Sequence, residues 1–284
     1  MKKLFILICI ILPGIIYGQG MHSRRIAASG GGASYTPEYQ AVYDAMTTPP
    51  SSSVAEAQDD FVEYLTVTTT YWDSIDAMWV FAQESNGDGE ALLEWKSGGV
   101  SNNATNVDAT AFTSLEGFTG DGASDYINLN WNPTDDGSQY TQNDACMIGY
   151  FRTIENDDNN MLMGDYGSGN DSYLFWAGGT TAQLQVNAGN SDNPSATNAI
   201  GVQAFVRRTS TEMIIHINGT EASATETSTG LTSTDFQALC AGGVLASDAQ
   251  VSLIIVGNGL SETAIENITT AFETYMDSNS KGIL

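Results

Sequence analysis

Aromatic, amide and carboxylate side chains lie close together in the second half of the chain, on and beside short apolar segments. A ring beside amide and carboxylate groups on neighbouring loops is the kind of surface that binds glycans. The best cluster of this kind is Asp171, Tyr173, Trp176 and Asn190. Tyr173 and Trp176 are three residues apart, so on a regular strand they face opposite sides. We therefore expect a ligand-binding surface here, with at least one of the two rings in the core.

Oxygen-bearing side chains in the same region could hold calcium, because Asp and Asn oxygens and backbone carbonyls suit a hard cation. The candidate metal ligands are Asp157, Asp158 and Asp165, with Asn159 beside them, or a second group of Asp171, Asp192 and Asn193. The sequence contains no EF-hand loop. The alternative is that these residues simply form turns, for which Asp and Asn are the expected residues.

Residues for catalysis are sparse. Glycoside hydrolases need a pair of carboxylates that flank the bond to be cleaved, and these often lie on one strand as Glu-x-Asp-x-Glu. No such string occurs, and the nearest acids, Glu116 and Asp121, stand on either side of an expected turn. A serine nucleophile needs a histidine base, and the only histidines are His22 and His216. The sequence favours a protein that is not an enzyme.

The charge balance is strongly acidic. The chain has 34 Asp and Glu against 9 Lys and Arg, a net charge of -25. Between Lys96 and Lys281 the only basic residues are Arg152, Arg207 and Arg208, which leaves no basic track for a phosphate backbone. Nucleic acid is therefore not an expected partner, and the acidity suits a soluble exported surface.

The first 20 residues have the pattern of a secretory signal peptide. Lys2 and Lys3 precede an apolar core, and Gly18 and Gly20 follow it at a small-x-small spacing. Residues 21–34, rich in Ser, Gly and Ala, are an expected flexible linker. Cys9 lies inside the apolar core, so a lipoprotein is not indicated. We expect a secreted or cell-surface protein with no integral membrane segment after signal cleavage.

The two cysteines that remain after residue 20 are Cys146 and Cys240. In an oxidising compartment they could close one disulfide, which in a chain of this size is not a disulfide framework. Both stand among apolar residues, where cysteine is often a small buried thiol. The sequence leaves both possibilities open.

Helical spacing dominates residues 35–97, which we expect to form a helical leader packed on the rest. Thr36 and Pro37 resemble an N-cap followed by proline at the first helical position, and a second apolar stripe covers 54–65. A third helix is predicted around Trp72, Ile75 and Trp79 because these apolar residues recur at three and four.

Short strands separated by turns dominate residues 98–284. The strands are expected at 145–153, 160–164, 172–176, 182–186, 201–207, 212–217 and 250–256. Asn218 and Gly219 mark a two-residue hairpin. From Ser261 onward an apolar stripe predicts one amphipathic C-terminal helix. The pattern predicts a mainly β fold, an antiparallel two-sheet jelly-roll sandwich with short N-terminal helices and this closing helix.

The helical leader is expected to connect to the β-sandwich at residues 116–133. Gly117, Gly120 and Gly122 predict a tight turn, and the strand after it places Ile127, Leu129 and Trp131 on one face as the first inward row of the core. No lysine and no helix follow the glycines, so this is not a phosphate loop.

Several of these motifs together resemble concanavalin A-like (laminin G-like) jelly rolls of bacteriophage structural proteins and exported Bacteroidetes proteins. They are Tyr-Thr-Pro-Glu-Tyr-Gln-Ala-Val at 35–42, Gly-Phe-Thr-Gly-Asp-Gly at 117–122 followed by Tyr126 and Ile127, Arg-Arg-Thr-Ser at 207–210 with Asn-Gly-Thr at 218–220, and the segment 259–275. The resemblance implies binding to a glycan or another cell-surface component, or adhesion. It also allows a structural or receptor-binding subunit of a virion or extracellular assembly, with self-association, and less strongly a glycoside hydrolase.

Overall fold

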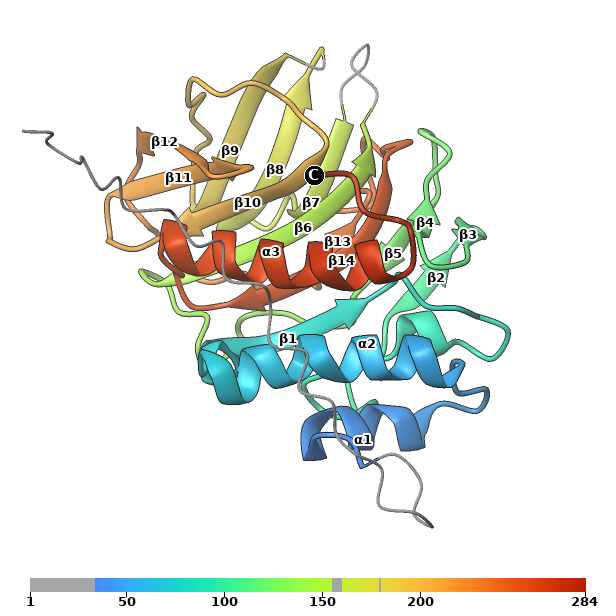
Figure 1. Cartoon of the computed structure of the whole chain (residues 1–284). Coiled ribbons are helices and arrows are strands. Elements are labelled where there is room, and N and C mark those ends of the chain that lie inside the picture. The colour runs from blue at the N-terminus through green and yellow to red at the C-terminus, as the bar shows by residue number, and fades with distance from the viewer. Residues whose placement is uncertain (1–33, 155–159, 179) are drawn as a thin grey trace, which may run out of the picture. The chain divides into compact units, whose positions relative to one another are not determined.

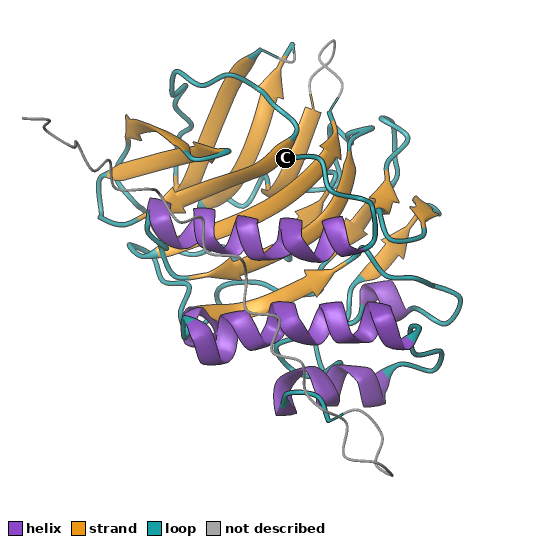
Figure 2. Cartoon of the chain, in the orientation of Figure 1, coloured by secondary structure: helices purple, strands orange, loops and turns teal. Residues whose placement is uncertain are grey.

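Two antiparallel β-sheets carry the fold of the computed structural model, which describes residues 34–154, 160–178 and 180–284. Within these residues one sheet has eight strands in the order β12-β11-β10-β6-β14-β4-β3, with β1 also paired to β14, and the other has six in the order β2-β5-β13-β7-β8-β9. Figure 1 labels the strands and colours the chain from its N- to its C-terminus, and Figure 2 colours strands and helices differently. All the pairings are antiparallel, which confirms the mainly β sandwich expected from the sequence.

The strands are short, as their spacing in the sequence predicts. Those of the eight-stranded sheet are β1 Ile75–Val80, β3 Ala111–Thr113, β4 Gly117–Thr119, β6 Ala145–Thr153, β10 Gly201–Arg207, β11 Glu212–Ile217, β12 Thr220–Thr225 and β14 Gln250–Gly257. Those of the six-stranded sheet are β2 Thr105–Val107, β5 Tyr126–Asn128, β7 Asn160–Asp165, β8 Asp171–Ala177, β9 Thr181–Ala188 and β13 Gln237–Ala238.

The main core lies between the two sheets. Ile127, Leu129 and Trp131 are all buried in it, which confirms them as an inward row. The Trp131 ring packs against Tyr140 and Phe236, with centroids 5.8 and 5.4 Å apart. Successive side chains of a strand alternate between faces, so the other side of each strand needs its own cover.

A layer of helices covers the outer face of the eight-stranded sheet (Figure 1). It consists of α1 (Pro37–Ala45), α2 (Ser52–Glu63) and α3 (Glu262–Ser278). The predicted caps are confirmed, because Thr36 accepts a hydrogen bond from Tyr39 N and Ser261 accepts one from Ala264 N. The central strands of this sheet are therefore buried on both faces, which explains their nearly continuous apolar sequences.

The predicted third helix is wrong. Residues Tyr71–Ser74 form one 3-10 turn, and the next six residues form β1, which pairs with β14. Ala77 and Trp79 face the core between the sheets, whereas Met78 and Val80 face the helices. A strand with apolar residues on both faces has no period of two, so it was misread as a helical stripe. The segment 35–97 is thus not wholly helical, since it contributes a strand to the sandwich.

The glycine stretch at 117–122 is also partly different from the expectation. Its first half is a strand, β4, and the turn begins only at Asp121, whose Oδ1 accepts hydrogen bonds from the backbone N–H groups of Ala123, Ser124 and Asp125. Gly117 has φ of +100°, and a Cβ there would lie 2.0 Å from the carbonyl oxygen of Val251. Glycine is therefore required for strand pairing at this position rather than for a reversal.

The cysteines do not pair in the structure. Cys146 on β6 packs toward the helices, and Cys240 contacts the carbonyl oxygen of Val244 through Sγ. Both are buried free thiols, and burial raises their pKa values to about 12 and about 11. The expected signal peptide and residues 21–33 of the linker lie outside the described residues. None of the helices that are described is long and apolar enough to span a membrane.

Candidate ligand-binding surface

Strand β8 separates the two rings that the sequence placed together. Trp176 points into the core between the sheets, is fully buried, and donates a hydrogen bond from Nε1 to Gln203 Oε1 over 2.8 Å. The alternation of side chains along a strand thus puts Trp176 on the face opposite Tyr173. Trp176 is a core residue, and its place in the predicted ligand set was wrong.

Tyr173 lies on the outer face of the six-stranded sheet. It forms a small apolar cluster with Met161, Phe175 and Ala241, and only 5% of its surface is exposed. Tyr166, in the turn between β7 and β8, packs edge-on against it with ring centroids 5.6 Å apart and an interplanar angle of 69°. Tyr166 is 49% exposed. The surface therefore has a solvent-facing ring supported by a buried one.

A second loop continues the exposed apolar surface beside Tyr166. Gly242 lies so close that a Cβ on it would be 2.3 Å from the Tyr166 carbonyl oxygen, and the Leu245 carbonyl accepts a hydrogen bond from Met161 N over 3.1 Å. The loop that carries Val244 and Leu245, which are 43% and 46% exposed, thus lies beside both Tyr166 and the start of β7. We call Tyr166, Tyr173, Val244 and Leu245 the Tyr166 surface.

Asp171 holds the loop that carries Tyr166. Its Oδ1 accepts hydrogen bonds from Ser168 N over 2.7 Å, from Ser168 Oγ over 2.8 Å and from Gly169 N over 3.0 Å. The carboxylate is 6% exposed, so it positions the loop instead of facing a ligand. Asp171 is therefore close to the surface predicted from the sequence, in a supporting place.

Asp165 lies beneath the same loop and is fully buried. Oδ1 accepts from Ser172 N over 2.9 Å, and Oδ2 lies within hydrogen-bond distance of Ser168 Oγ, at 3.1 Å. Burial raises its pKa to about 7, against hydrogen bonds from Thr232, Ser172 and Ser168 that favour the charged form. Both carboxylates, Asp165 and Asp171, thus contact the Ser168 hydroxyl, which links the buried polar interior to the exposed loop.

Asn190 is exposed on the neighbouring loop, where its Nδ2 donates to Glu226 Oε1 over 3.1 Å. A third loop joins this end of the sandwich, since the Thr229 hydroxyl donates to Asn170 Oδ1 over 2.8 Å. Hydroxyl and amide groups therefore surround the β8 end of the Tyr166 surface. Of the four predicted ligand residues, Asp171 and Tyr173 thus lie on β8, and Asn190 lies in the loop after β9, where it contacts Glu226.

Of the three predicted metal ligands, Asp165 is the one that the structure describes. Asp157 and Asp158 lie outside the described residues. Asp165 is buried with both oxygens hydrogen-bonded, so it would have to exchange these bonds for a cation. In the described parts of the chain no three His, Cys, Asp or Glu side chains are grouped as a metal site would require.

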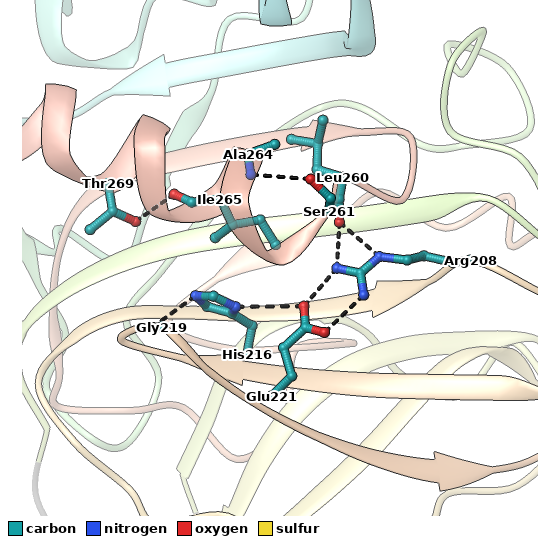
Figure 3. A network of polar contacts seen from close by, with 9 residues as sticks. All are labelled: Arg208, His216, Gly219, Glu221, Leu260, Ser261, Ala264, Ile265 and Thr269. Atoms are coloured by element: carbon teal, nitrogen blue, oxygen red, sulfur yellow. Dashed lines mark hydrogen bonds and ion pairs between the residues drawn. The ribbon is translucent and has the colours of Figure 1, made fainter.

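His216 belongs to a different polar network, shown in Figure 3. Its Nε2 accepts a hydrogen bond from Gly219 N over 3.1 Å, its Nδ1 is 3.6 Å from Glu221 Oε1, and its side chain is fully buried. Glu221 forms a two-pronged ion pair with Arg208, at 2.8 and 2.6 Å, and Arg208 Nε donates to the Leu260 carbonyl over 2.9 Å. Burial lowers the pKa of His216, so the ring is held neutral as a structural part of the β11–β12 hairpin.

Comparisons with known proteins give matches among solved structures alone. No protein-family model matches the chain, and no curated protein matches it. The binding domain of botulinum neurotoxin DC in complex with SialylT is 10% identical with a TM-score of 0.51, over 70% of this chain and 51% of that one. The likeness to that domain extends to the fold: a β-sandwich.

Two further structures are more distant in shape. A Trypanosoma rangeli sialidase in complex with 2,3-difluorosialic acid is 12% identical with a TM-score of 0.47, over 81% of this chain and 40% of the sialidase. A Ruminococcus gnavus IT-sialidase CBM40 bound to alpha2,3 sialyllactose is 11% identical with a TM-score of 0.38, over 53% of this chain and 96% of that one. The chain thus spans well under half the length of the sialidase.

Tyr166 is the residue that sequence reasoning missed. The available signal was an isolated aromatic residue directly before Gly167, Ser168 and Gly169, in a loop where polar turn formers are usual. The loop at 241–245 beside it is 75 residues or more away in the chain, so the neighbours of Tyr166 could not be placed from local sequence.

Proposed function

We propose that this chain is an exported, non-catalytic glycan-binding protein and that the Tyr166 surface is where the glycan binds. The observation that carries the proposal is the half-exposed Tyr166 ring, held edge-on by buried Tyr173 beside loops with amide and hydroxyl groups. An exposed, rigid ring suits the apolar face of a sugar, and neighbouring polar groups suit its hydroxyls. Ordering such a ring in advance lowers the entropic cost of binding.

Two further points support the proposal. The toxin binding domain with a TM-score of 0.51 was solved in complex with SialylT, so a sandwich of this kind is compatible with ligand binding. The signal-peptide pattern of residues 1–20 supports export to a place where glycans are exposed. The non-catalytic part rests on the absence from the sequence of a paired-carboxylate string.

The test is a glycan array with the purified protein and its Tyr166→Ala variant, at millimolar calcium and again with a chelator. We expect binding by the parent protein and a loss of at least about tenfold in affinity for the variant, as for a central aromatic anchor of about 1.4 kcal/mol or more. Val67→Ala is the matched control, because Val67 is 69% exposed on the helical side of the molecule.

Several outcomes would contradict the proposal. Cleavage of a bound polysaccharide would refute its non-catalytic part, and equal binding by Tyr166→Ala would refute the assigned surface. A fixed oligomer with no sugar binding would favour the structural-subunit alternative. If the parent protein binds with calcium but not with the chelator, a calcium ion belongs to the site. If the chelator leaves binding unchanged, glycan recognition does not depend on calcium.

A further inference from the structure

Each basic side chain of residues 34–284 makes at least one hydrogen bond or ion pair away from the Tyr166 surface. Four of the nine Lys and Arg precede residue 34, which leaves Lys96, Arg152, Arg207, Arg208 and Lys281. Lys96 donates to the Trp72 carbonyl and lies 4.8 Å from the centre of the Trp72 ring. Arg208 is bound to Glu221, and Lys281 pairs with Glu116 beside Arg152, which donates to the Lys281 carbonyl.

Arg207 lies beneath the segment that carries Glu226, the hydrogen-bond partner of Asn190, and it is fully buried. Its Nε donates to the Val186 carbonyl over 2.8 Å, and its Nη1 donates to the Glu226 carbonyl over 3.1 Å. Its Nη2 has no hydrogen-bond partner but is buried as well, so the guanidinium cannot offer its fork to a carboxylate or sulfate outside the loops.

Acidic groups surround the same loops. Asp171 lies directly under the Tyr166 loop, Glu226 contacts Asn190, and Asp192 is exposed on the adjoining loop. These charges add to the field of a chain with net charge -25. An anionic ligand would meet like charge and would find no charged donor among the described residues, which costs both encounter rate and affinity.

From these observations we infer that the Tyr166 surface takes an uncharged saccharide and discriminates against sialylated and sulfated forms of the same sugar. The inference rests on the proposed glycan-binding function and deepens it by naming the ligand class. The aromatic ring would contact the apolar face of a neutral sugar, and the loop amides and hydroxyls would bind its hydroxyl groups. Discrimination comes from repulsion as well as from fit.

The test uses matched pairs of immobilised oligosaccharides, each neutral sugar beside its sialylated and sulfated forms, at 20 and 300 mM NaCl. We expect each neutral member that is bound to bind at least tenfold more tightly than its charged partners at low salt, with a smaller ratio at high salt. Equal or tighter binding of the charged members would overturn the inference while leaving the proposed function standing. No binding to any member would overturn both.

Charge variants locate the effect. Val244→Lys places a cation on the exposed part of the Tyr166 surface and should raise affinity for the charged members at least threefold, whereas Val244→Gln should not. Val67→Lys makes the same charge change on the helical side and should leave the ratio of affinities for the neutral and charged members unchanged. An equal gain from Val67→Lys would assign the discrimination to net charge alone and overturn its assignment to this surface.

Discussion

Asp165 places a carboxyl group in the interior directly beneath the loop that carries Tyr166. Burial raises its pKa to about 7, whereas in an unfolded chain it is about 3.9. Between these values the folded state keeps a proton that the unfolded state has released. The stabilising contribution is therefore complete below about pH 3.9 and is lost as the pH rises through about 7.

We predict that Asp165→Asn makes the free energy of unfolding depend less on pH between about 3.9 and about 7. The amide oxygen can still accept from Ser172 N, and its NH₂ group can donate to the Ser168 hydroxyl. Relative to the variant, the parent should lose on the order of 2 kcal/mol of unfolding free energy between pH 5 and pH 8, as a pKa unit is about 1.4 kcal/mol. Urea unfolding at both pH values measures it. Parallel profiles would show that Asp165 is ionised in the folded state at pH 5.

At the scale of elements, the network around Arg208 joins the β11–β12 hairpin to the start of α3 (Figure 3). Glu221 is on β12, and Leu260 precedes the N-cap residue Ser261. The hydrogen bonds from Arg208 lower the pKa of Glu221, so the stability that the pair contributes is present above about 4.5 and is lost as the pH falls through the lower folded value.

Arg208→Lys is predicted to destabilise the fold by about 1–2 kcal/mol, because lysine cannot make the two-pronged contact and also reach the Leu260 carbonyl. Partial exposure of both side chains limits the size of the effect. A double-mutant cycle with Glu221→Gln, measured by urea unfolding at pH 7, isolates the pair from the carbonyl contact. Additive single effects would mean that the contact with Glu221 contributes little and that the loss in Arg208→Lys comes from the Leu260 carbonyl contact.

The elements also show where sequence reasoning succeeds. The bounds of β6, β10 and β11 were predicted to the residue, since turn formers stand on both sides of each strand and the segments are rich in β-branched and aromatic residues. The prediction for the β1 segment failed because this strand is covered on both faces. Trp79 and Met78 point in opposite directions, and both are buried. Whether a second layer covers a strand is a tertiary fact with no local signal.

The candidate site shows the same contrast between features with a local sequence signal and features without one. The three-residue spacing of Tyr173 and Trp176 predicted that one ring would be lost to the core, and Trp176 was. Nothing local predicted that the Asp171 carboxylate would accept hydrogen bonds from the turn that precedes it, because the same carboxylate pattern suits a ligand and a loop cap.

At the scale of the whole molecule, the excess of acidic residues opposes folding by mutual repulsion. The chain has 34 acidic and 9 basic residues, so most carboxylates have no basic partner available to them. Charges on a folded surface are closer together than in an unfolded chain, and salt screens them over about 10 Å at 0.1 M. Added NaCl should therefore stabilise this fold, although it weakens individual pairs such as Lys281–Glu116.

We predict that Tm at pH 7.5 rises by a few degrees between 20 and 500 mM NaCl, which corresponds to about 1 kcal/mol in a domain of this size. At pH 4, where many carboxylates are protonated, the same salt step should give a smaller rise. Sucrose at matched osmolality controls for effects of solute exclusion from the surface. A fall in Tm with salt at pH 7.5 would mean that the few ion pairs outweigh the repulsion. A rise that is equal at both pH values would point to a salt effect on apolar burial instead, because that effect is independent of how many carboxylates are charged.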